Sequence, residues 1–403
     1  MKSKRNNPTI VLVEFYSDGH FPTYLKAFAK VLLQMGHNLI VLCPEAVGLN
    51  EWINRNCPAY SGKIKIYPIS KPRLSDFGTV KIRSIINSVR RWEITAEMIR
   101  DLIKDTGRQP DLIFFDYVDD FLNILVPCSF IDRIFPYPWS GLYFHPSHLR
   151  IKSGYSLIQK GLLERDHLLS SKYCRSIAVL DEGIIAHLRN KPGVRKVSLF
   201  PDISDNTMPD ENYGPAAEIR LKANGRKIVG MLGSLQKRKG ILTLLELSQR
   251  YKDANLFYIF CGNLDETGFT PGELRHINNL IGAPPDNCFF HNSYIPDGAM
   301  FNAVVVLCDV LFAVYENFYH SSNILTKAAN FRKWVVVGKG YCMAERVKKF
   351  RLGLSVDAGD VAACFEALRD LSGGASGLQP DYTGYMELHS ESRLREAFAA
   401  VVG

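Results

Sequence analysis

The amino-acid sequence predicts an α/β protein made of two Rossmann-like domains, each a doubly wound parallel sheet. Its length of 403 residues fits two domains of common size. In both halves, short apolar runs of strand character alternate with segments of helical spacing, which is the pattern of a parallel sheet covered by helices. A polar, turn-rich stretch over 201–225 interrupts the alternation, so we expect a linker there.

The first half begins with a βαβ unit. Residues 9–15 are β-branched and apolar, as in a buried parallel strand, and the apolar positions between 25 and 33 recur at helical spacing. A second strand over 38–43 ends at Pro44, and a long helix is expected over 80–104. Further strands are expected over 111–115, 141–144 and 176–180. Residues 1–200 therefore form the predicted N-terminal domain.

The alternation restarts after the expected linker, which indicates a second domain over 226–385 and not an extension of the first sheet. Its strands are predicted over 227–232, 256–260, 288–291, 310–314 and 334–337. The last segment, 386–403, has helical character and no strand after it. We expect this C-terminal helix to pack back toward the N-terminal domain.

The composition excludes several classes of protein. Hydrophobic residues make up 46% of the chain and charged residues 22%, which is typical of a globular and not of a disordered protein. No apolar run reaches the roughly 20 residues that cross a bilayer. The nine cysteines are scattered without a CxxC pair, which argues against a disulfide scaffold and a Cys-type zinc site and favours the cytoplasm. No nucleic-acid-binding signature accompanies the net charge of +8, so nucleic acid is not expected as a partner.

Positive charge is concentrated between Arg55 and Lys104, where eleven basic and four acidic residues give a local charge of +7. Two interpretations stay open. The apolar stripe of the predicted helix packs against the sheet and leaves a solvated basic face, or the region makes weak, salt-sensitive contact with an anionic acceptor or with the inner face of a membrane. The stripe consists of Ile82, Ile85, Ile86 and Val89.

The strongest local signal is the segment GSLQKRKG at 233–240, between a predicted strand and a predicted helix. Glycine at such a turn lets the backbone approach an anion, the start of the helix supplies N–H donors, and three consecutive cations add charge. The segment is neither a Walker loop nor a GxGxxG loop, so a plain ATPase or dehydrogenase is disfavoured. It indicates diphosphate binding, with a solvated basic turn as the alternative.

A second signal lies between the predicted strand over 310–314 and the helix that follows it. Ser322 and Asn323 have the character of a helix N-cap, and the N–H groups behind them suit a phosphate. Glu316 stands at the end of the strand, where an acid is a binding residue or an ordinary surface residue. Both loops follow parallel strands, so we expect them to lie side by side at one edge of the sheet.

Together these segments resemble the nucleotide-binding domain of GT-B glycosyltransferases, closest to the retaining family four. The resemblance runs over about 145 residues and is carried by the following segments: GSLQKRKG at 233–240, FFHNSYIPDGAMFNAVVVLCDVLFAVYENF at 289–318, HSSNILTKAANFRKWVVV at 320–337 and GLSVDAGDVAACFEALRDL at 353–371. It implies a GT-B fold whose two Rossmann-like domains face a central cleft. The N-terminal domain would bind the acceptor and the C-terminal domain a nucleotide sugar.

The resemblance further implies an enzyme of the hexosyltransferase type that transfers a sugar from a nucleoside diphosphate sugar to an acceptor hydroxyl, with retention of configuration. It implies no cofactor and no obligatory metal, because GT-B enzymes hold the leaving group with fixed cations and helix ends. The acceptor stays open among a glycan, a lipid-linked molecule and a small molecule. A catalytically silent GT-B subunit, a sugar-binding partner and a nucleotide-sugar 2-epimerase are the alternatives.

The resemblance assigns site residues one by one. The catalytic candidates are His145, Arg238 and Lys239. The donor-binding candidates are Gly19, Gly233, Ser234, Gly240, Glu316, Ser321, Ser322, Asn323 and Lys327. His20 is the acceptor-side candidate. The acids at 116, 119 and 120 follow a strand but lack DxD spacing, so we interpret them as solvated loop acids and not as a metal site.

Two positions depart from the family pattern. Ser234 stands where the family has arginine, so Arg238 is the candidate replacement cation. Lys327 stands where the family has an acid that binds the nucleotide ribose, and an ammonium group can only donate hydrogen bonds. Either Lys327 turns away from the donor, or it reaches back to the diphosphate as an extra cation; we favour the second outcome as the expectation to be tested.

Overall fold

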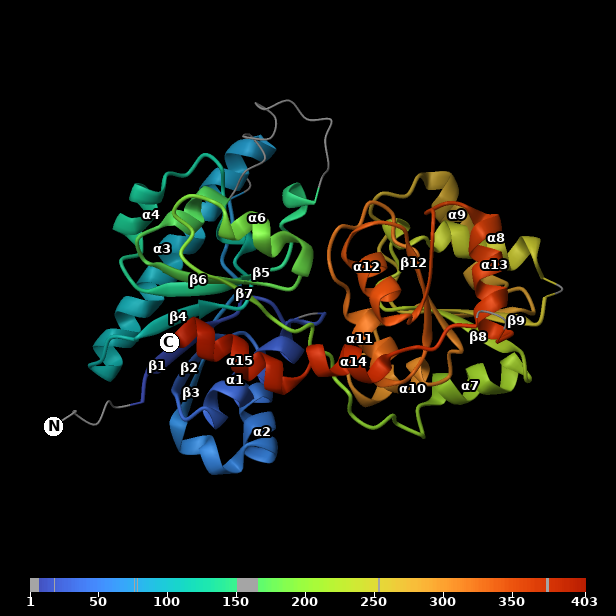
Figure 1. The fold of residues 1–403 in the computed structure, drawn as a ribbon, viewed down its shortest axis with the longest axis horizontal. Coiled ribbons are helices and arrows are strands. Elements are labelled where there is room, and N and C mark those ends of the chain that lie inside the picture. Colours follow the sequence, from blue (N-terminus) through green and yellow to red (C-terminus); the bar gives the residue numbers. More distant parts are fainter. Residues whose placement is uncertain are drawn as a thin grey trace. The chain divides into compact units, whose positions relative to one another are not determined.

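The computed structural model describes residues 7–17, 19–75, 77, 79–150, 166–252, 254–374 and 377–403, and of Lys81 the backbone alone. The chain divides into two compact units. The first is Met1–Ile203 together with His389–Gly403, and the second is Ser204–Leu388. In each unit, helices cover both faces of a sheet whose strands are all parallel (Figure 1).

The first unit contains a sheet of seven strands in the order β3-β2-β1-β4-β5-β6-β7. The inner strand β1 pairs on both sides, with Val11 opposite Ile40 of β2 and Ile113 of β4. The strands are β1 (Thr9–Val13), β2 (Asn38–Cys43), β3 (Ile64–Pro68), β4 (Leu112–Phe115), β5 (Trp139–Tyr143), β6 (Cys174–Val179) and β7 (Val197–Leu199). The central strands are buried on both faces, which explains their unbroken apolar sequences.

Two cores flank this sheet. One includes residues of α1, α2 and α15, where the rings of Phe28 and Phe398 lie 5.2 Å apart. The other includes residues of α3 and α4, centred on Trp92. The α-helices are α1 (Phe21–Gln34), α2 (Ala46–Asn56), α3 (Val80–Thr106), α4 (Cys128–Ile134), α6 (Ile185–Arg189) and α15 (Glu391–Val402). Short 3-10 turns are η1 (Pro58–Lys63), η2 (Asp119–Phe121), η3 (Ser147–Leu149), η4 (Asp166–Ser170) and η5 (Glu182–Ile184).

The second unit contains a sheet of six strands in the order β10-β9-β8-β11-β12-β13. The strands are β8 (Lys227–Leu232), β9 (Leu256–Cys261), β10 (Cys288–His291), β11 (Val310–Ala313), β12 (Trp334–Gly338) and β13 (Gly353–Val356). The helices are α7 (Gly214–Ala223), α8 (Ile241–Arg250), α9 (Pro271–Gly282), α10 (Ala299–Val305), α11 (Asn323–Asn330), α12 (Tyr341–Phe350), α13 (Val361–Ser372) and α14 (Tyr382–Leu388), with the 3-10 turn η6 (Lys237–Lys239). Because β8 and β11 are neighbours, the loops that follow them begin side by side.

The segment expected as a linker is largely part of the second unit. Residues 204–225 belong to that unit, and within them α7 buries Ala216, Ile219 and Ala223. A linker was expected because turn residues precede α7. The charged residues of α7 made its buried apolar positions hard to recognise in the sequence. The apolar pattern did not predict the strands β3, β7 and β13, which are short and lie at sheet edges.

No helix among the described residues is long and apolar enough to cross a membrane. All nine cysteines are free, and eight of them are buried.

Candidate functional site

Two loops meet at the carboxyl edge of the second sheet. Gly240 ends the first loop with a φ of +81°, and a Cβ atom there would lie 2.6 Å from the carbonyl oxygen of Val314 in the second loop. Glycine is therefore required for this close approach. The backbone N–H of Glu316 donates a hydrogen bond of 2.7 Å to the Arg238 carbonyl and ties the loops together. The prediction that the two loops lie side by side is confirmed.

The cations of the first loop stack on aromatic rings of the second. The Arg238 guanidinium lies 5.2 Å from the centre of the Phe318 ring, and the Lys239 ammonium lies 5.7 Å from the centre of the Tyr315 ring. Arg238 is exposed and Lys239 is half-buried. These contacts hold two adjacent positive charges at the start of α8, where the helix dipole adds to their attraction for an anion.

Lys237 and Lys239 differ in their partners although they share one turn. The Lys237 ammonium pairs with both carboxylate oxygens of Glu273 at 2.8 Å. Within the described parts of the chain, Lys239 has no carboxylate partner. Burial of Lys239 and the nearby charge of Arg238 lower its pKa to about 8. A cation that is partly desolvated and lacks a counter-ion is electrostatically suited to bind an anion.

The start of α11 forms the other side of this edge. Ser322 occupies the N-cap position, but its side chain does not cap the helix. It hydrogen-bonds instead to Tyr315, whose pKa is raised by burial. The predicted cap position is therefore confirmed, but the Ser322 hydroxyl makes no capping hydrogen bond because a buried phenol competes for it. Asn323 Oδ1 accepts a hydrogen bond of 2.8 Å from Ser204, while Glu316 and Ser321 are half-buried.

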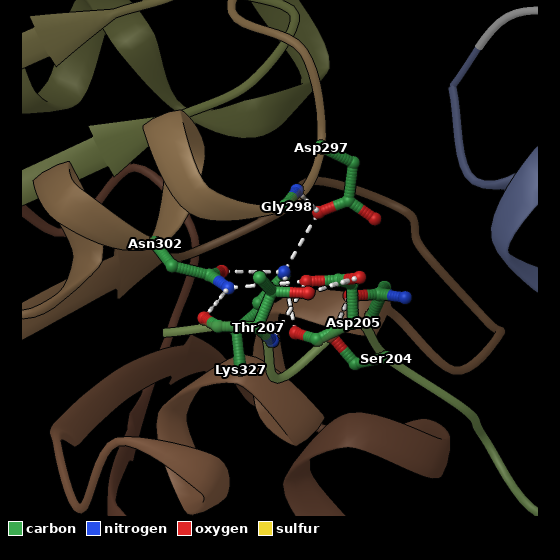
Figure 2. Close-up of polar contacts among 8 residues, drawn as sticks. Ser204, Asp205, Thr207, Asp297, Gly298, Asn302 and Lys327 are labelled. Carbon is green, nitrogen blue, oxygen red and sulfur yellow. Dashed lines mark hydrogen bonds and ion pairs between the residues drawn. The ribbon is translucent and has the colours of Figure 1, made fainter. Parts of the chain in front are cut away.

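The Lys327 ammonium is held inside the second unit by Asp205, Asp297 and Asn302, as Figure 2 shows. Its side chain is 2% exposed, and its ammonium lies 2.7 Å from a carboxylate oxygen of Asp297. The same ammonium donates to the Asn302 side-chain oxygen at 2.6 Å and to the Asp205 carbonyl at 2.7 Å. Three acceptors saturate the three donors of the ammonium group. The expectation that Lys327 adds a phosphate-binding cation is therefore wrong.

The Lys327 contacts belong to a larger polar cluster that anchors the first residues of the second unit. The Asn302 amide donates to the Thr207 carbonyl at 2.8 Å and to an Asp205 carboxylate oxygen at 3.2 Å. That carboxylate also accepts the Thr207 N–H at 2.9 Å. Sequence alone could not place this cluster, because its members come from three segments that are far apart along the chain.

In the first unit, the candidates Gly19 and His20 lie in the turn between β1 and α1. Gly19 has a φ of +62° and is exposed. His20 is the N-cap residue of α1, and its ring centre lies 4.8 Å from that of Phe21 and 5.2 Å from that of Phe144. His20 is therefore part of an aromatic cluster at the carboxyl edge of the first sheet.

His145 follows β5 at the same edge, and the exposed fraction of its side chain is 44%. Its Nδ1 atom lies 3.2 Å from the Tyr117 hydroxyl and 3.7 Å from a carboxylate oxygen of Asp119. Asp119 accepts the backbone N–H groups of Phe144 at 2.8 Å and of His145 at 2.6 Å. The structure thus brings His145 together with Asp119, which was expected to be a solvated loop acid.

That interpretation of the loop acids is wrong for two of the three. Asp116 is 1% exposed and Asp119 is 5% exposed, while Asp120 is paired with Arg91 at 3.0 Å. Burial and the nearby charge of Glu14 raise the pKa of Asp116 well above its usual range. The apolar neighbours of these acids, in the sequence DYVDDF at 116–121, were the signal for burial.

Comparison with known proteins supports the fold at low sequence identity. No family model and no curated protein matches the chain. Among solved structures, it is similar to sucrose-phosphate synthase from Thermosynechococcus elongatus, with 16% identity over 98% of this chain and 96% of that chain and a TM-score of 0.64. It is also similar to Anabaena HepE in complex with UDP-glucose, with 12% identity over 97% of this chain and 98% of that chain and a TM-score of 0.62.

A third similar structure is an α,α-trehalose-phosphate synthase (UDP-forming) from Burkholderia vietnamiensis, with 13% identity over 98% of both chains and a TM-score of 0.61. These likenesses extend over nearly the full length of each chain and over both units. Together with the two parallel sheets, they show that the chain has the GT-B fold. The predicted fold class is confirmed.

Proposed function

We propose that the chain is a glycosyltransferase that transfers a sugar from a nucleoside diphosphate sugar to an acceptor hydroxyl. The observation that carries the proposal is the anion-facing edge of the second sheet, where Arg238 and Lys239 lie together at the start of α8. A diphosphate supplies the counter-ion that the Lys239 ammonium lacks among the described residues. Similar folds have been solved with UDP or UDP-glucose bound, which supports the same class of ligand.

In the proposed reaction, the acceptor oxygen forms a bond to C1 of the sugar as the bond from C1 to the diphosphate oxygen breaks. The departing diphosphate takes up the hydroxyl proton. Arg238, Lys239 and the start of α8 stabilise the negative charge that develops on the leaving group, and removing one such donor typically raises a barrier by roughly 3–4 kcal/mol. Fixed cations thus perform this role without an obligatory metal. Retention of configuration is part of the proposal and rests on the resemblance to family four.

The remaining candidates have roles in the same proposal. His145 contacts the donor sugar, and His20 lies on the acceptor side. Gly19, Gly233 and Ser234 let the backbone approach the donor, and Glu316 is the acid available for the ribose, since Lys327 is bound internally. The free cysteines support a reducing compartment such as the cytoplasm.

A matched pair of lysines tests donor binding. We expect Lys239→Met to weaken the binding of UDP, GDP or ADP, whichever the protein binds, by about 10- to 100-fold, the scale of a lost hydrogen bond to a charged group. Lys237→Met should change the affinity less than twofold, because Lys237 is already paired with Glu273. Isothermal titration calorimetry measures both. Equal losses in the two variants, or no nucleotide binding by the wild type, would contradict the proposal.

Turnover separates the enzyme from the alternatives. A transferase incubated with the matching nucleotide sugar slowly releases the nucleoside diphosphate without an acceptor, and an acceptor accelerates this release. A silent subunit binds without release, and an epimerase yields the 2-epimer. The coupling constant of the anomeric proton in the product, measured by NMR, decides between retention and inversion.

We also propose that the first unit makes weak contact with an anionic membrane surface. Phe77, Val80 and Ile82 are 76%, 80% and 46% exposed around the start of α3, and Arg73 and Arg90 are exposed near them in the chain. An open groove of about 550 Å³ along α3 has both apolar and charged lining residues: Ile85, Ile86, Val89, Arg90, Glu93, Ile94, Glu97 and Phe130. Exposed apolar residues flanked by cations suit the interface of an anionic bilayer.

Co-sedimentation with vesicles containing phosphatidylglycerol tests this contact. Binding should be present at low salt and fall as salt rises, because the cationic part of the attraction is screened. Val80→Asp should abolish binding, whereas Leu221→Asp, at a site 79% exposed in the second unit, should not. No binding at low salt, or equal effects of both variants, would exclude the contact.

A further inference from the structure

Asp119 connects two loops at the carboxyl edge of the first sheet through its side chain. The Val118 N–H donates to the Leu142 carbonyl at 3.0 Å, in continuation of the pairing between β4 and β5. At the next residue, the Asp119 carboxylate accepts the N–H groups of Phe144 and His145 at 2.8 and 2.6 Å. The carboxylate therefore takes over the connection where the backbone pairing has ended.

The same carboxylate faces the His145 ring. One of its oxygens accepts the His145 N–H and lies 3.7 Å from Nδ1 of the imidazole. The Tyr117 hydroxyl lies 3.2 Å from that nitrogen. The Asp119 side chain is 6% exposed, whereas the His145 side chain is 44% exposed. A buried acid thus holds the turn that presents an exposed imidazole at the edge of the sheet.

We propose that Asp119 is the positioning residue of His145: its ionised carboxylate holds the turn at Phe144 and His145, and its protonation releases one of the two N–H groups. The consequence for turnover rests on the proposed function, in which His145 contacts the donor sugar. The positioning itself is independent of that function.

The chemistry of the carboxyl group makes the positioning depend on pH. An ionised carboxylate accepts hydrogen bonds on both oxygens, whereas a protonated one carries a donor on one oxygen. Burial raises the pKa of Asp119 to about 7, with a contribution from the charge of Asp120, and the two backbone N–H groups oppose this rise. Asp120 is itself paired with Arg91 and hydrogen-bonded by Tyr16. The ionised carboxylate of Asp119 therefore holds the turn above about pH 7, and protonation of this group loosens the turn below about pH 7.

The amide signals of the turn report this ionisation directly. The test uses protein labelled with 15N-phenylalanine in which His145→Gln removes the imidazole, a group that itself ionises in this pH range. Phe144→Leu identifies the backbone amide signal of Phe144 among those of the 23 phenylalanines. We expect the Phe144 signal to shift between pH 5 and 9 with a midpoint near 7. Asp119→Asn, added to the same protein, should abolish this shift, because a carboxamide does not ionise in that range. A Phe144 signal that does not titrate, or one that titrates unchanged with Asp119→Asn, would overturn the proposal.

Asp120→Asn is the matched control. It removes a neighbouring charge but no bond to the His145 turn, so the titration should persist with a lower midpoint. If Asp119→Asn does not fold, the titration of the Phe144 signal and this control still decide, because a midpoint unmoved in Asp120→Asn would contradict the assignment to Asp119. In the folded Asp119→Asn protein, kcat at pH 8 should be at least tenfold lower than in the wild type and should approach the value of the wild type at pH 5.5. Absence of turnover in the wild type would refute the proposed function, while the amide titration would still judge the positioning.

Discussion

Replacing Lys327 with methionine keeps the apolar stem of the side chain and removes its ammonium group. Three acceptors then lose a donor at 2.6–2.7 Å: the Asp297 carboxylate, the Asn302 side-chain oxygen and the Asp205 carbonyl. Breaking a buried ion pair costs about 3–5 kcal/mol when the remaining charge stays buried. The Asp297 side chain is 24% exposed and also accepts the Gly298 N–H, so water and that N–H relieve part of the penalty.

We therefore expect Lys327→Met to lower the free energy of unfolding of the second unit by about 3 kcal/mol. For a unit of this size, that loss corresponds to a fall in Tm of about 6–12 °C. Urea unfolding followed by circular dichroism measures it. Lys339→Met is the matched control, because the Lys339–Asp357 pair is just as short, at 2.6 Å, but both side chains are more than half exposed. Exposed pairs contribute about 0–1 kcal/mol.

Nucleotide affinity completes the test. The Lys327 ammonium contacts neither the loop at 233–240 nor the loop at 314–322. The folded Lys327→Met protein should therefore bind a nucleoside diphosphate as the wild type does. Lys327→Glu should be more destabilising than Lys327→Met, since it places a second carboxyl group beside Asp297 and two carbonyl-type acceptors. A loss of stability no greater than that of Lys339→Met, or weaker nucleotide binding without a loss of stability, would refute the reasoning.

Three further predictions concern single positions. His145→Ala should reduce kcat by at least tenfold and leave nucleotide affinity and Tm nearly unchanged; a parallel loss of stability and activity would mark the ring as structural. Gly240→Ala should cost about 2–4 kcal/mol of unfolding free energy, because the new Cβ meets a carbonyl oxygen at 2.6 Å, whereas Gly268→Ala, with a similar φ and open space, should cost about 1 kcal/mol. Asp116 has a raised pKa in the native state, so the native state keeps a proton that the unfolded chain releases above about pH 4, and stability falls as pH rises. In Asp116→Asn this pH dependence of urea unfolding should be smaller, and an unchanged slope would show that the acid is ionised when buried.

Local pattern was sufficient to predict the inner strands of both sheets. The strands β1, β2, β8 and β9 are continuous apolar runs, and runs of that kind bury both faces of a parallel sheet. The glycine-rich turn before α8 was visible because it joins such a strand to a helix. Its contact with the loop after β11 then followed from the parallel order of the strands.

Local pattern failed where a polar residue acts through partners distant in the sequence. The apolar neighbours of Asp119 indicate burial, but they do not identify the backbone N–H groups of the neighbouring loop that its carboxylate accepts. Ser322 occupies the predicted cap position, yet a buried phenol takes its hydroxyl. The partner of a polar group is decided by the packed chain, so no local window contains it.

The sequence by itself determined the alternation of strands and helices and the concentration of cations at 237–239, because each depends on residues close together in the chain. The GT-B architecture was predicted from the resemblance of longer segments to a known family. Tertiary structure alone decided how individual charges are used. Lys237 and Lys239 share one turn, but a carboxylate on α9 neutralises the first and leaves the second available to an anion. Lys327 is bound by Asp205 and by the segment 297–302, which meet it only in the folded unit. The function of a charge depends on the groups that surround it within a few ångströms, and folding brings those groups together.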